Sequence, residues 1–176
     1  MNYRPKKVAV LGSGVMGSGI ACHLANVGMD VIMLDIVTPK LSDNDSKSKF
    51  HRNKLVNSAL QKTIKSKPAP LYHKSFSSRI KTGNFEDDFD KISESDWIIE
   101  VVVENLEIKK QIFEKVDKHR KNGSLVSSNT SSIPINLLAQ DCSDDFKSHF
   151  CGTHFFNPVR YLKLLEIIPI EETQKE

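Results

Sequence analysis

The 176-residue sequence lacks the features that would mark a membrane-spanning, secreted or low-complexity chain. No apolar run approaches the roughly 20 residues of a membrane-spanning helix. The apolar run near the N-terminus stops at Gly12 and is too short for the core of a signal peptide. Only 8 Gly and 7 Pro are present, and the 39% of hydrophobic residues suffice for a core, which excludes wholesale disorder.

Cysteine is also scarce. Cys22, Cys142 and Cys151 form an odd, widely spaced set without a CxxC pair. This pattern argues against a disulfide framework or a zinc site and fits reduced thiols in a cytoplasmic protein. We therefore expect a soluble, cytoplasmic chain with a single domain over residues 1–176 and no metal site.

Positive charge is concentrated in one segment. Residues 37–82 carry nine Lys and two Arg against two Asp, a net +9 in a chain whose net charge is +3. Such an excess favours an anionic partner, with a solvated lysine-rich helix as the alternative. Nucleic acid is not the expected partner, because the segment lacks aromatic interleaving and any DNA-reading motif.

Short apolar runs alternate with amphipathic segments along the chain. Strands are expected at 7–12, 30–35, 79–85, 96–104, 124–129, 150–158 and 163–170. Helices are expected at 15–27, 50–66, 108–116 and 134–140. The alternation implies right-handed crossovers and a mainly parallel sheet, so we predict a doubly wound α/β domain of the Rossmann type.

A glycine motif follows the first expected strand. Gly12, Gly14 and Gly17 match GxGxxG, with Val15 and Met16 between the last two glycines. The motif alone is weak, but its place between a buried strand and a helix strengthens it. Gly12 would permit the tight turn, Gly14 would let a pyrophosphate approach, and Gly17 would let helix and strand pack closely. The start of the helix would offer N–H groups to phosphates.

Asp35 ends the second strand, 23 residues after Gly12. A carboxylate there accepts hydrogen bonds from ribose hydroxyls and repels a 2′-phosphate, which favours NAD over NADP. FAD uses a similar fingerprint and remains an alternative for these residues alone. A glycine turn without a ligand, beside an ordinary loop acid, is the other alternative.

Four further segments extend the pattern: "EVVVENLEIKKQIFEKVD", "SSNTSSIPI", "GTHFFNPVRYLKLLEIIP" and the strand ending in Asp35. With the glycine loop, and in this order, they resemble the N-terminal NAD-binding domain of L-3-hydroxyacyl-CoA dehydrogenases, enzymes of fatty acid β-oxidation. The resemblance is dense from about 96 to 169 and weak from about 37 to 78. It implies oxidation of (S)-3-hydroxyacyl-CoA to 3-oxoacyl-CoA with NAD.

The resemblance also implies two catalytic roles. His154 matches the base that takes the proton of the 3-hydroxyl, a task suited to an imidazole that is neutral near pH 7. Glu166 matches the carboxylate that holds this imidazole, and the two could meet if their strands pair. A partly buried core histidine between aromatic residues is the alternative for His154.

Other site residues follow from the same resemblance. Ser131 matches a hydroxyl that contacts substrate and cofactor, with a helix N-cap as its alternative. Asn157 matches an amide near the nicotinamide, or else an ordinary Asn-Pro turn. Glu104 and Lys109 match residues beside the nicotinamide ribose, or else a helix-start acid and a surface lysine.

The basic segment would then meet coenzyme A. Ser58, Lys62 and Lys65 fall on one helical stripe and are the candidate contacts with its anionic groups. Members of the family continue into a helical domain that completes the acyl-CoA site and carries most of the dimer interface. We therefore expect a fragment that binds NAD and turns over poorly, from a homodimeric enzyme. A sugar-acid dehydrogenase and a non-catalytic NAD-binding module remain alternatives.

Overall fold

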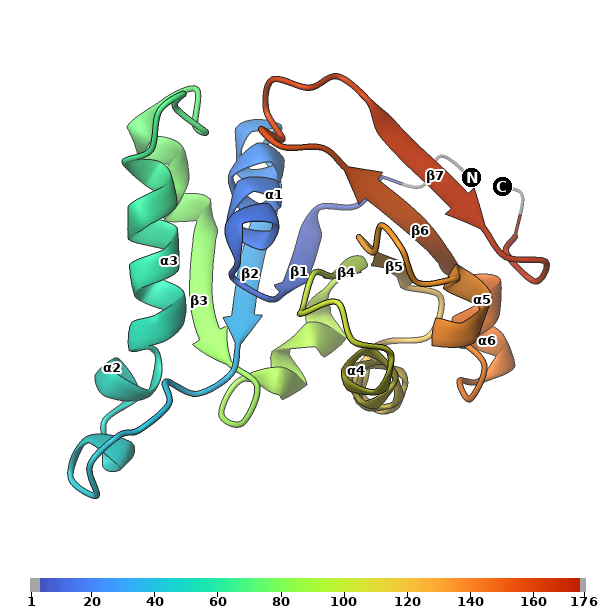
Figure 1. Cartoon of the computed structure of the whole chain (residues 1–176), viewed down its shortest axis with the longest axis horizontal. Helices are drawn as coiled ribbons and strands as arrows, with labels where there is room; N and C mark the ends of the chain where they lie inside the picture. The colour runs from blue at the N-terminus through green and yellow to red at the C-terminus, as the bar shows by residue number, and fades with distance from the viewer. Residues whose placement is uncertain (1–3, 175–176) are drawn as a thin grey trace.

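The strands of the described part of the chain, residues 4–174, form one seven-stranded sheet in a computed structural model (Figure 1). Its order is β3-β2-β1-β4-β5-β6-β7. The first six strands pair in parallel, and β7 runs antiparallel to β6 at the edge. The strands are β1 Lys7–Leu11, β2 Asp30–Asp35, β3 Ile80–Asn84, β4 Trp97–Glu100, β5 Leu125–Ser128, β6 Phe150–Phe155 and β7 Leu165–Pro169. The predicted mainly parallel, doubly wound sheet is confirmed.

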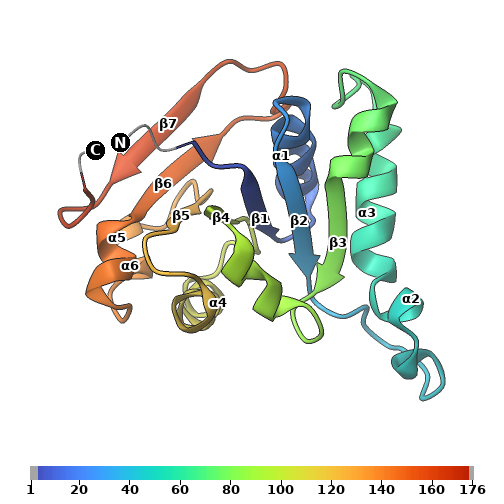
Figure 2. The same ribbon diagram turned by 180° about the vertical axis from the view of Figure 1, so that it is seen from behind.

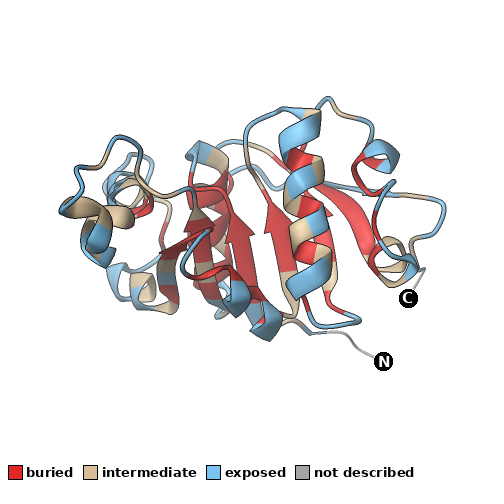
Figure 3. Cartoon of the chain, turned by 90° about the horizontal axis from the view of Figure 1, so that it is seen from below, coloured by how far each residue is buried: buried red, intermediate tan, exposed pale blue. Residues whose placement is uncertain are grey.

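Helices cover both faces of this sheet (Figures 1 and 2). On one face, α1 (Val15–Asn26) and α3 (Lys54–Ile64) pack against Val8 and Val10 of β1. On the other face, α4 (Leu106–His119), α5 (Ile135–Leu138) and α6 (Asp144–Ser148) pack against Ala9 and Leu11 of the same strand. The alternation of β1 side chains between two cores explains its unbroken apolar sequence. The central strands are buried and the outer sides of the helices are exposed (Figure 3).

The expected helix 50–66 is wrong as a single element. It is divided into α2 (Lys49–Arg52) and α3, with the buried Asn53 between them. Asn53 Oδ1 accepts a hydrogen bond from Asn84 at the end of β3, and Thr38 Oγ1 accepts one from the N–H of Leu55. These contacts from distant segments fix a new helix start that periodicity does not reveal.

Several expected boundaries are also too long. The strand expected to reach residue 104 ends at Glu100, where its carboxylate accepts the N–H of Val102 and turns the chain out of the sheet. The strand expected to reach residue 158 ends at Phe155. The short α6 and the 3-10 helices η1 (Asp45–Lys47), η2 (Lys74–Arg79) and η3 (Phe89–Glu94) were not expected.

Part of the positive charge of residues 37–82 is neutralised within the chain. Arg52 forms ion pairs with Glu86 (2.6 Å) and Asp87 (2.7 Å), and Lys49 lies 3.0 Å from the buried carboxylate of Asp88. These pairs attach the segment after β2 to the end of β3. The part of the charge left for a partner is therefore smaller than the sequence suggests, and it includes the exposed Lys62 and Lys65 of the α3 region.

The structure can also be searched for membrane-spanning helices and for metal sites. Among residues 4–174, no helix has both the length and the apolar character required to cross a membrane. Within the same range, no group of His, Cys, Asp or Glu has the arrangement of a metal site. The three cysteines are free and buried, and burial raises the pKa of Cys22 to about 12.

Candidate cofactor and catalytic site

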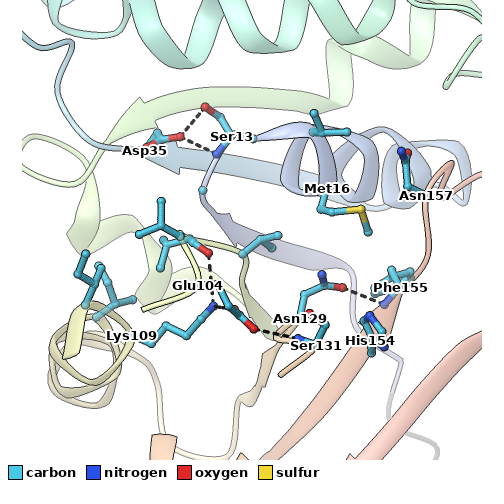
Figure 4. Close-up of a pocket in the computed structure, with 18 of the residues that line it drawn as sticks. Ser13, Met16, Asp35, Glu104, Lys109, Asn129, Ser131, His154, Phe155 and Asn157 are labelled. Carbon is cyan, nitrogen blue, oxygen red and sulfur yellow. Dashed lines mark hydrogen bonds and ion pairs between the residues drawn. The ribbon is translucent and has the colours of Figure 1, made fainter. Parts of the chain in front are cut away.

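A cavity of about 840 Å³ opens at the carboxyl ends of the parallel strands. It is bordered by the turn after β1, the end of β2, the segments after β4 and β5, and the end of β6. Ligands of doubly wound sheets bind at this edge, where the strand order reverses beside β1. Figure 4 shows Asp35 and Ser13 at one end of the cavity and His154 and Ser131 at the other.

The three motif glycines have different surroundings. Gly12 has φ +113°, and a Cβ there would lie 2.5 Å from the carbonyl oxygen of Val101. A Cβ on Gly17 would lie 2.0 Å from the carbonyl oxygen of Gly12, so helix α1 and the turn touch at this point. A Cβ on Gly14 would meet no described atom within 4 Å, which leaves space for a phosphate. The surroundings suit a dinucleotide at the start of α1, where Val15 and Met16 line the cavity.

Asp35 lies at the end of β2 and lines the cavity. Its Oδ2 accepts hydrogen bonds from the N–H (2.6 Å) and the hydroxyl (2.5 Å) of Ser13, and its Oδ1 accepts the N–H of Ile36 (2.7 Å). The carboxylate is thereby oriented beside the glycine loop. A 2′-phosphate brought to this point would meet a fixed negative charge.

His154 and Glu166 face each other across the β6–β7 pair. Their antiparallel register places the two residues directly opposite, and His154 Nδ1 lies 2.8 Å from Glu166 Oε2. With Glu166 as the acceptor, Nδ1 carries the proton and Nε2 is left as a proton acceptor. The ring centroid of Phe156 lies 4.4 Å from that of His154. His154 lines the cavity and lies within hydrogen-bonding distance of a carboxylate, although it is also partly buried beside an aromatic ring, as the alternative expects.

Glu104 organises the loop after β5. Its Oε1 accepts hydrogen bonds from the Thr130 hydroxyl (2.5 Å), the N–H of Ser131 (3.1 Å), and the N–H (3.1 Å) and hydroxyl (3.0 Å) of Ser132. Burial alone would raise the pKa of Glu104, but these hydrogen bonds and the charge of Lys109 lower it to about 2. Ser131 lines the cavity, and Pro134 occupies the N-cap of α5, so the capping alternative for Ser131 is wrong.

Lys109 is not a surface lysine. Only 1% of its side chain is exposed, and its Nζ lies 2.6 Å from Glu100 Oε1 and 3.2 Å from Glu104 Oε2. Glu100 itself is fully buried, and sequence reasoning missed it. The signal was present, because an acidic residue inside the apolar run "WIIEVVV" requires a partner.

Two amides complete the cavity near His154. Asn129 follows β5, and its Oδ1 accepts the N–H of Phe155 (2.8 Å), which joins the ends of β5 and β6. Sequence reasoning missed this residue, although it lies in the quoted "SSNTSS" segment. Asn157 is exposed and lines both this cavity and a second one.

The second cavity, of about 600 Å³, lies between α3 and the chain that follows β6. Lys62 lines it, whereas the exposed Ser58 and Lys65 lie outside its lining. Arg160 closes one side by donating hydrogen bonds to the carbonyl oxygens of Ala69 (2.7 Å) and Leu71 (3.0 Å). The structure thus brings one of the three predicted coenzyme A contacts to a cavity adjoining the cofactor site.

A glycine turn that leaves phosphate space, an acid at the end of β2 and a His–Glu pair at the same sheet edge define a Rossmann domain of a dinucleotide-dependent dehydrogenase. A model of the family "3-hydroxyacyl-CoA dehydrogenase, NAD binding domain" matches residues 7–176. The chain belongs to this family, and its cofactor is NAD.

Individual relatives agree. The chain is 58% identical over its whole length to a probable 3-hydroxyacyl-CoA dehydrogenase of Bacillus subtilis, of which it covers 23%. It is 44% identical over 96% of its length to a putative fatty acid oxidation complex trifunctional enzyme of Rickettsia felis, of which it covers 22%. The crystal structure of (S)-3-hydroxybutyryl-CoA dehydrogenase PaaH1 from Ralstonia eutropha matches 98% of the chain, with a TM-score of 0.72 and 32% identity. The chain covers 56% of that protein.

Proposed function

We propose that this chain supplies the cofactor site and the acid–base pair for NAD-dependent oxidation of (S)-3-hydroxyacyl-CoA to 3-oxoacyl-CoA. The carrying observation is the 2.8 Å contact between His154 and Glu166 at the cavity that also contains the glycine loop. A reaction that removes a hydride and a proton from one alcohol needs a base and a hydride acceptor side by side. The cavity of about 840 Å³ is lined both by His154 and by the glycine loop, which supports this pairing.

His154 Nε2 accepts the proton of the 3-hydroxyl as the C3–H bond is broken. Glu166 holds the imidazole through Nδ1 and stabilises the positive charge that develops on the ring. Bound NAD supplies the hydride acceptor. Ser131 lies at the same end of the cavity and donates a hydrogen bond to the substrate oxygen, while in the reverse reaction His154 returns the proton.

The cofactor residues have separate tasks in this proposal. Asp35 binds the adenine ribose, and Gly14 with the start of α1, including Val15 and Met16, holds the pyrophosphate. Glu104 and Lys109 lie beside the nicotinamide ribose, and Asn157 lies beside the nicotinamide. The fixed charge of Asp35 favours NAD over NADP.

The substrate is proposed from the basic segment together with the names of the relatives. Lys62 at the second cavity, with Ser58 and Lys65 on the same helix stripe, would meet the phosphates of coenzyme A. The role in fatty acid β-oxidation agrees with the name of the Rickettsia relative. A sugar-acid substrate would give the basic segment no anionic nucleotide to bind.

The wider setting is also a proposal. The relatives are longer than this chain, and we propose that the homodimer interface and the rest of the acyl-CoA site lie in that additional length. Strong turnover by residues 1–176 alone would contradict this. Cytoplasmic location, expected from the reduced thiols, stays a prediction.

A comparison of three substrates tests the proposal. NADH formation by the full-length protein is measured with (S)-3-hydroxybutyryl-CoA, with its (R) isomer and with free 3-hydroxybutyrate. We expect turnover of the (S)-CoA ester alone. Equal turnover of the free acid would favour a hydroxy-acid dehydrogenase, and the absence of turnover with tight NAD binding would favour a non-catalytic module.

A further inference from the structure

A buried ion pair lies directly behind the cofactor cavity. The side chain of Glu100 at the end of β4 is 0% exposed, and that of Lys109 in α4 is 1% exposed. Such pairs are weak evidence for stability, because desolvation offsets most of the attraction, whereas in some proteins they fix one arrangement of the groups around them. Because Lys109 lines the cavity, the groups whose arrangement this pair could fix are those at the cavity wall.

The donors of Lys109 are all in use. An ammonium group has three N–H donors. The Lys109 Nζ lies within reach of Glu100 Oε1 (2.6 Å), Glu104 Oε2 (3.2 Å) and the carbonyl oxygen of Val102 (3.3 Å). Its position is therefore fixed from three sides, and its contact with Glu104 has one geometry.

Glu100 connects this lysine to two strand ends. Its Oε1 also accepts the N–H of Val102 (2.7 Å), and its Oε2 accepts the hydroxyl of Ser128 (2.5 Å) at the end of β5. Each oxygen of the carboxylate thus has a partner. Glu100 is too deeply buried to touch a ligand, so any effect on the site must pass through the groups that it contacts, which are Lys109, the N–H of Val102 and the hydroxyl of Ser128.

Glu104 carries the contact onward to the cavity. One of its oxygens faces Lys109, and the other accepts four hydrogen bonds from Thr130, Ser131 and Ser132. Figure 4 shows Glu104 between Lys109 and Ser131. A displacement of the Lys109 ammonium would therefore move Glu104 and, with it, the loop. Asp35, at the other end of the cavity, is not part of this network, because its hydrogen-bond partners are Ser13 and Ile36.

We propose that Glu100 is a positioning residue for the nicotinamide half of the cofactor site, acting through Lys109 and Glu104. This inference rests on the proposed placement of the nicotinamide ribose beside Glu104 and Lys109. It requires that a change at Glu100 lower the affinity for NAD and leave the affinity for ADP, which carries only the adenine half, unchanged.

Calorimetric titration of the chain with NAD and with ADP tests the inference. For Glu100→Gln we expect an affinity for NAD about tenfold lower, the size of one hydrogen bond to a charged group, and an unchanged affinity for ADP. The matched control is Asp145→Asn, which alters a carboxylate paired with the buried Arg120 at the opposite end of β5. The control should lower thermal stability and change neither affinity. Equal losses for NAD and ADP in Glu100→Gln would overturn the inference.

A second pair of variants keeps the test valid if Glu100→Gln does not fold. If Lys109 is the route by which Glu100 acts, Lys109→Met and the double variant Glu100→Gln/Lys109→Met should bind NAD equally weakly. A further loss in the double variant would overturn the route through Lys109 and point to the contacts of Glu100 with Val102 and Ser128. An unchanged NAD affinity in Lys109→Met would instead contradict the proposed placement of the nicotinamide ribose.

Discussion

The two ends of the cofactor cavity hold their carboxylates in different ways. Asp35 is oriented by a single turn, through Ser13 and the adjacent N–H of Ile36. Glu104 is held by three residues of the loop after β5 and by a lysine that is itself fixed by a buried acid. The carboxylate at the proposed adenine end thus depends on two neighbouring residues. The carboxylate at the proposed catalytic end belongs to a network, in which a mutation of one residue alters the contacts of several others. The two ends should therefore respond differently to mutation.

The largest difference should follow from a change at the catalytic end. His154→Gln removes the proposed base and keeps a side chain of similar size. We expect kcat of the full-length protein to fall by about 10²- to 10⁴-fold, the usual contribution of a general base, and the affinity for NAD to change little. Steady-state NADH formation and calorimetry measure the two quantities. His149→Gln, which alters the histidine directly before the start of β6, at the other end of the strand from His154, is the control and should retain normal kcat. A variant of His154 with nearly full activity would remove it from the mechanism.

The next largest effect should appear at the adenine end. Asp35→Asn keeps the shape of the side chain and removes its charge, so we expect NAD affinity to fall by about tenfold or more. NADP affinity should fall less or rise, because the repulsion of the 2′-phosphate is lost. Calorimetric titrations with both dinucleotides measure the ratio. Asp43→Asn alters an exposed acid in the following loop and should leave the ratio unchanged; an unchanged ratio in Asp35→Asn would contradict its role.

A smaller effect is expected at the second cavity. Lys62→Gln should weaken coenzyme A binding by about fivefold at low salt, since an exposed ion pair contributes up to about 1 kcal/mol. The difference should shrink as salt is added, because exposed charges are screened. Lys74→Gln, at an exposed position in η2, is the control. An unchanged coenzyme A affinity in Lys62→Gln would show that Lys62 is not one of the coenzyme A contacts.

The smallest effect concerns pH and stability. The pKa of Glu104 is lowered from 4.5 to about 2. A depressed pKa contributes stability that is present above the unfolded value, near pH 4.5, and is lost as the pH falls towards 2. Glu104→Gln should therefore flatten the decline of thermal stability in this window. Glu107→Gln, at an exposed position in the first turn of α4, should retain the decline of the parent chain. Matching declines in Glu104→Gln and the parent would show that Glu104 has no such role.

The same difference between the two ends explains what the sequence could predict. The turn at Gly12 and the acid at Asp35 lie at the ends of apolar strands, so periodicity and spacing locate them. The pairing of His154 with Glu166 depends on an antiparallel register that no local pattern specifies, and the structure was needed to establish it. The family resemblance nevertheless named both residues.

The network around Lys109 was harder to predict. Lys109 occupies an amphipathic helix rich in charge, where a solvent-facing lysine is the ordinary expectation. Its burial depends on Glu100, nine positions earlier, and on Ser128, which is 28 positions from Glu100. The break at Asn53 has the same origin, because its partner Asn84 lies 31 positions away. Long-range contacts of polar side chains leave little trace in periodicity.

Isotope transfer tests the proposed reaction most directly. (S)-3-Hydroxybutyryl-CoA carrying deuterium at C3 is oxidised by the full-length protein, and the label is measured in NADH and in water. We expect about one deuterium per NADH formed and none released to water, with transfer slowed strongly in His154→Gln. Deuterium in the water, or equal transfer in His154→Gln, would contradict hydride transfer assisted by this histidine.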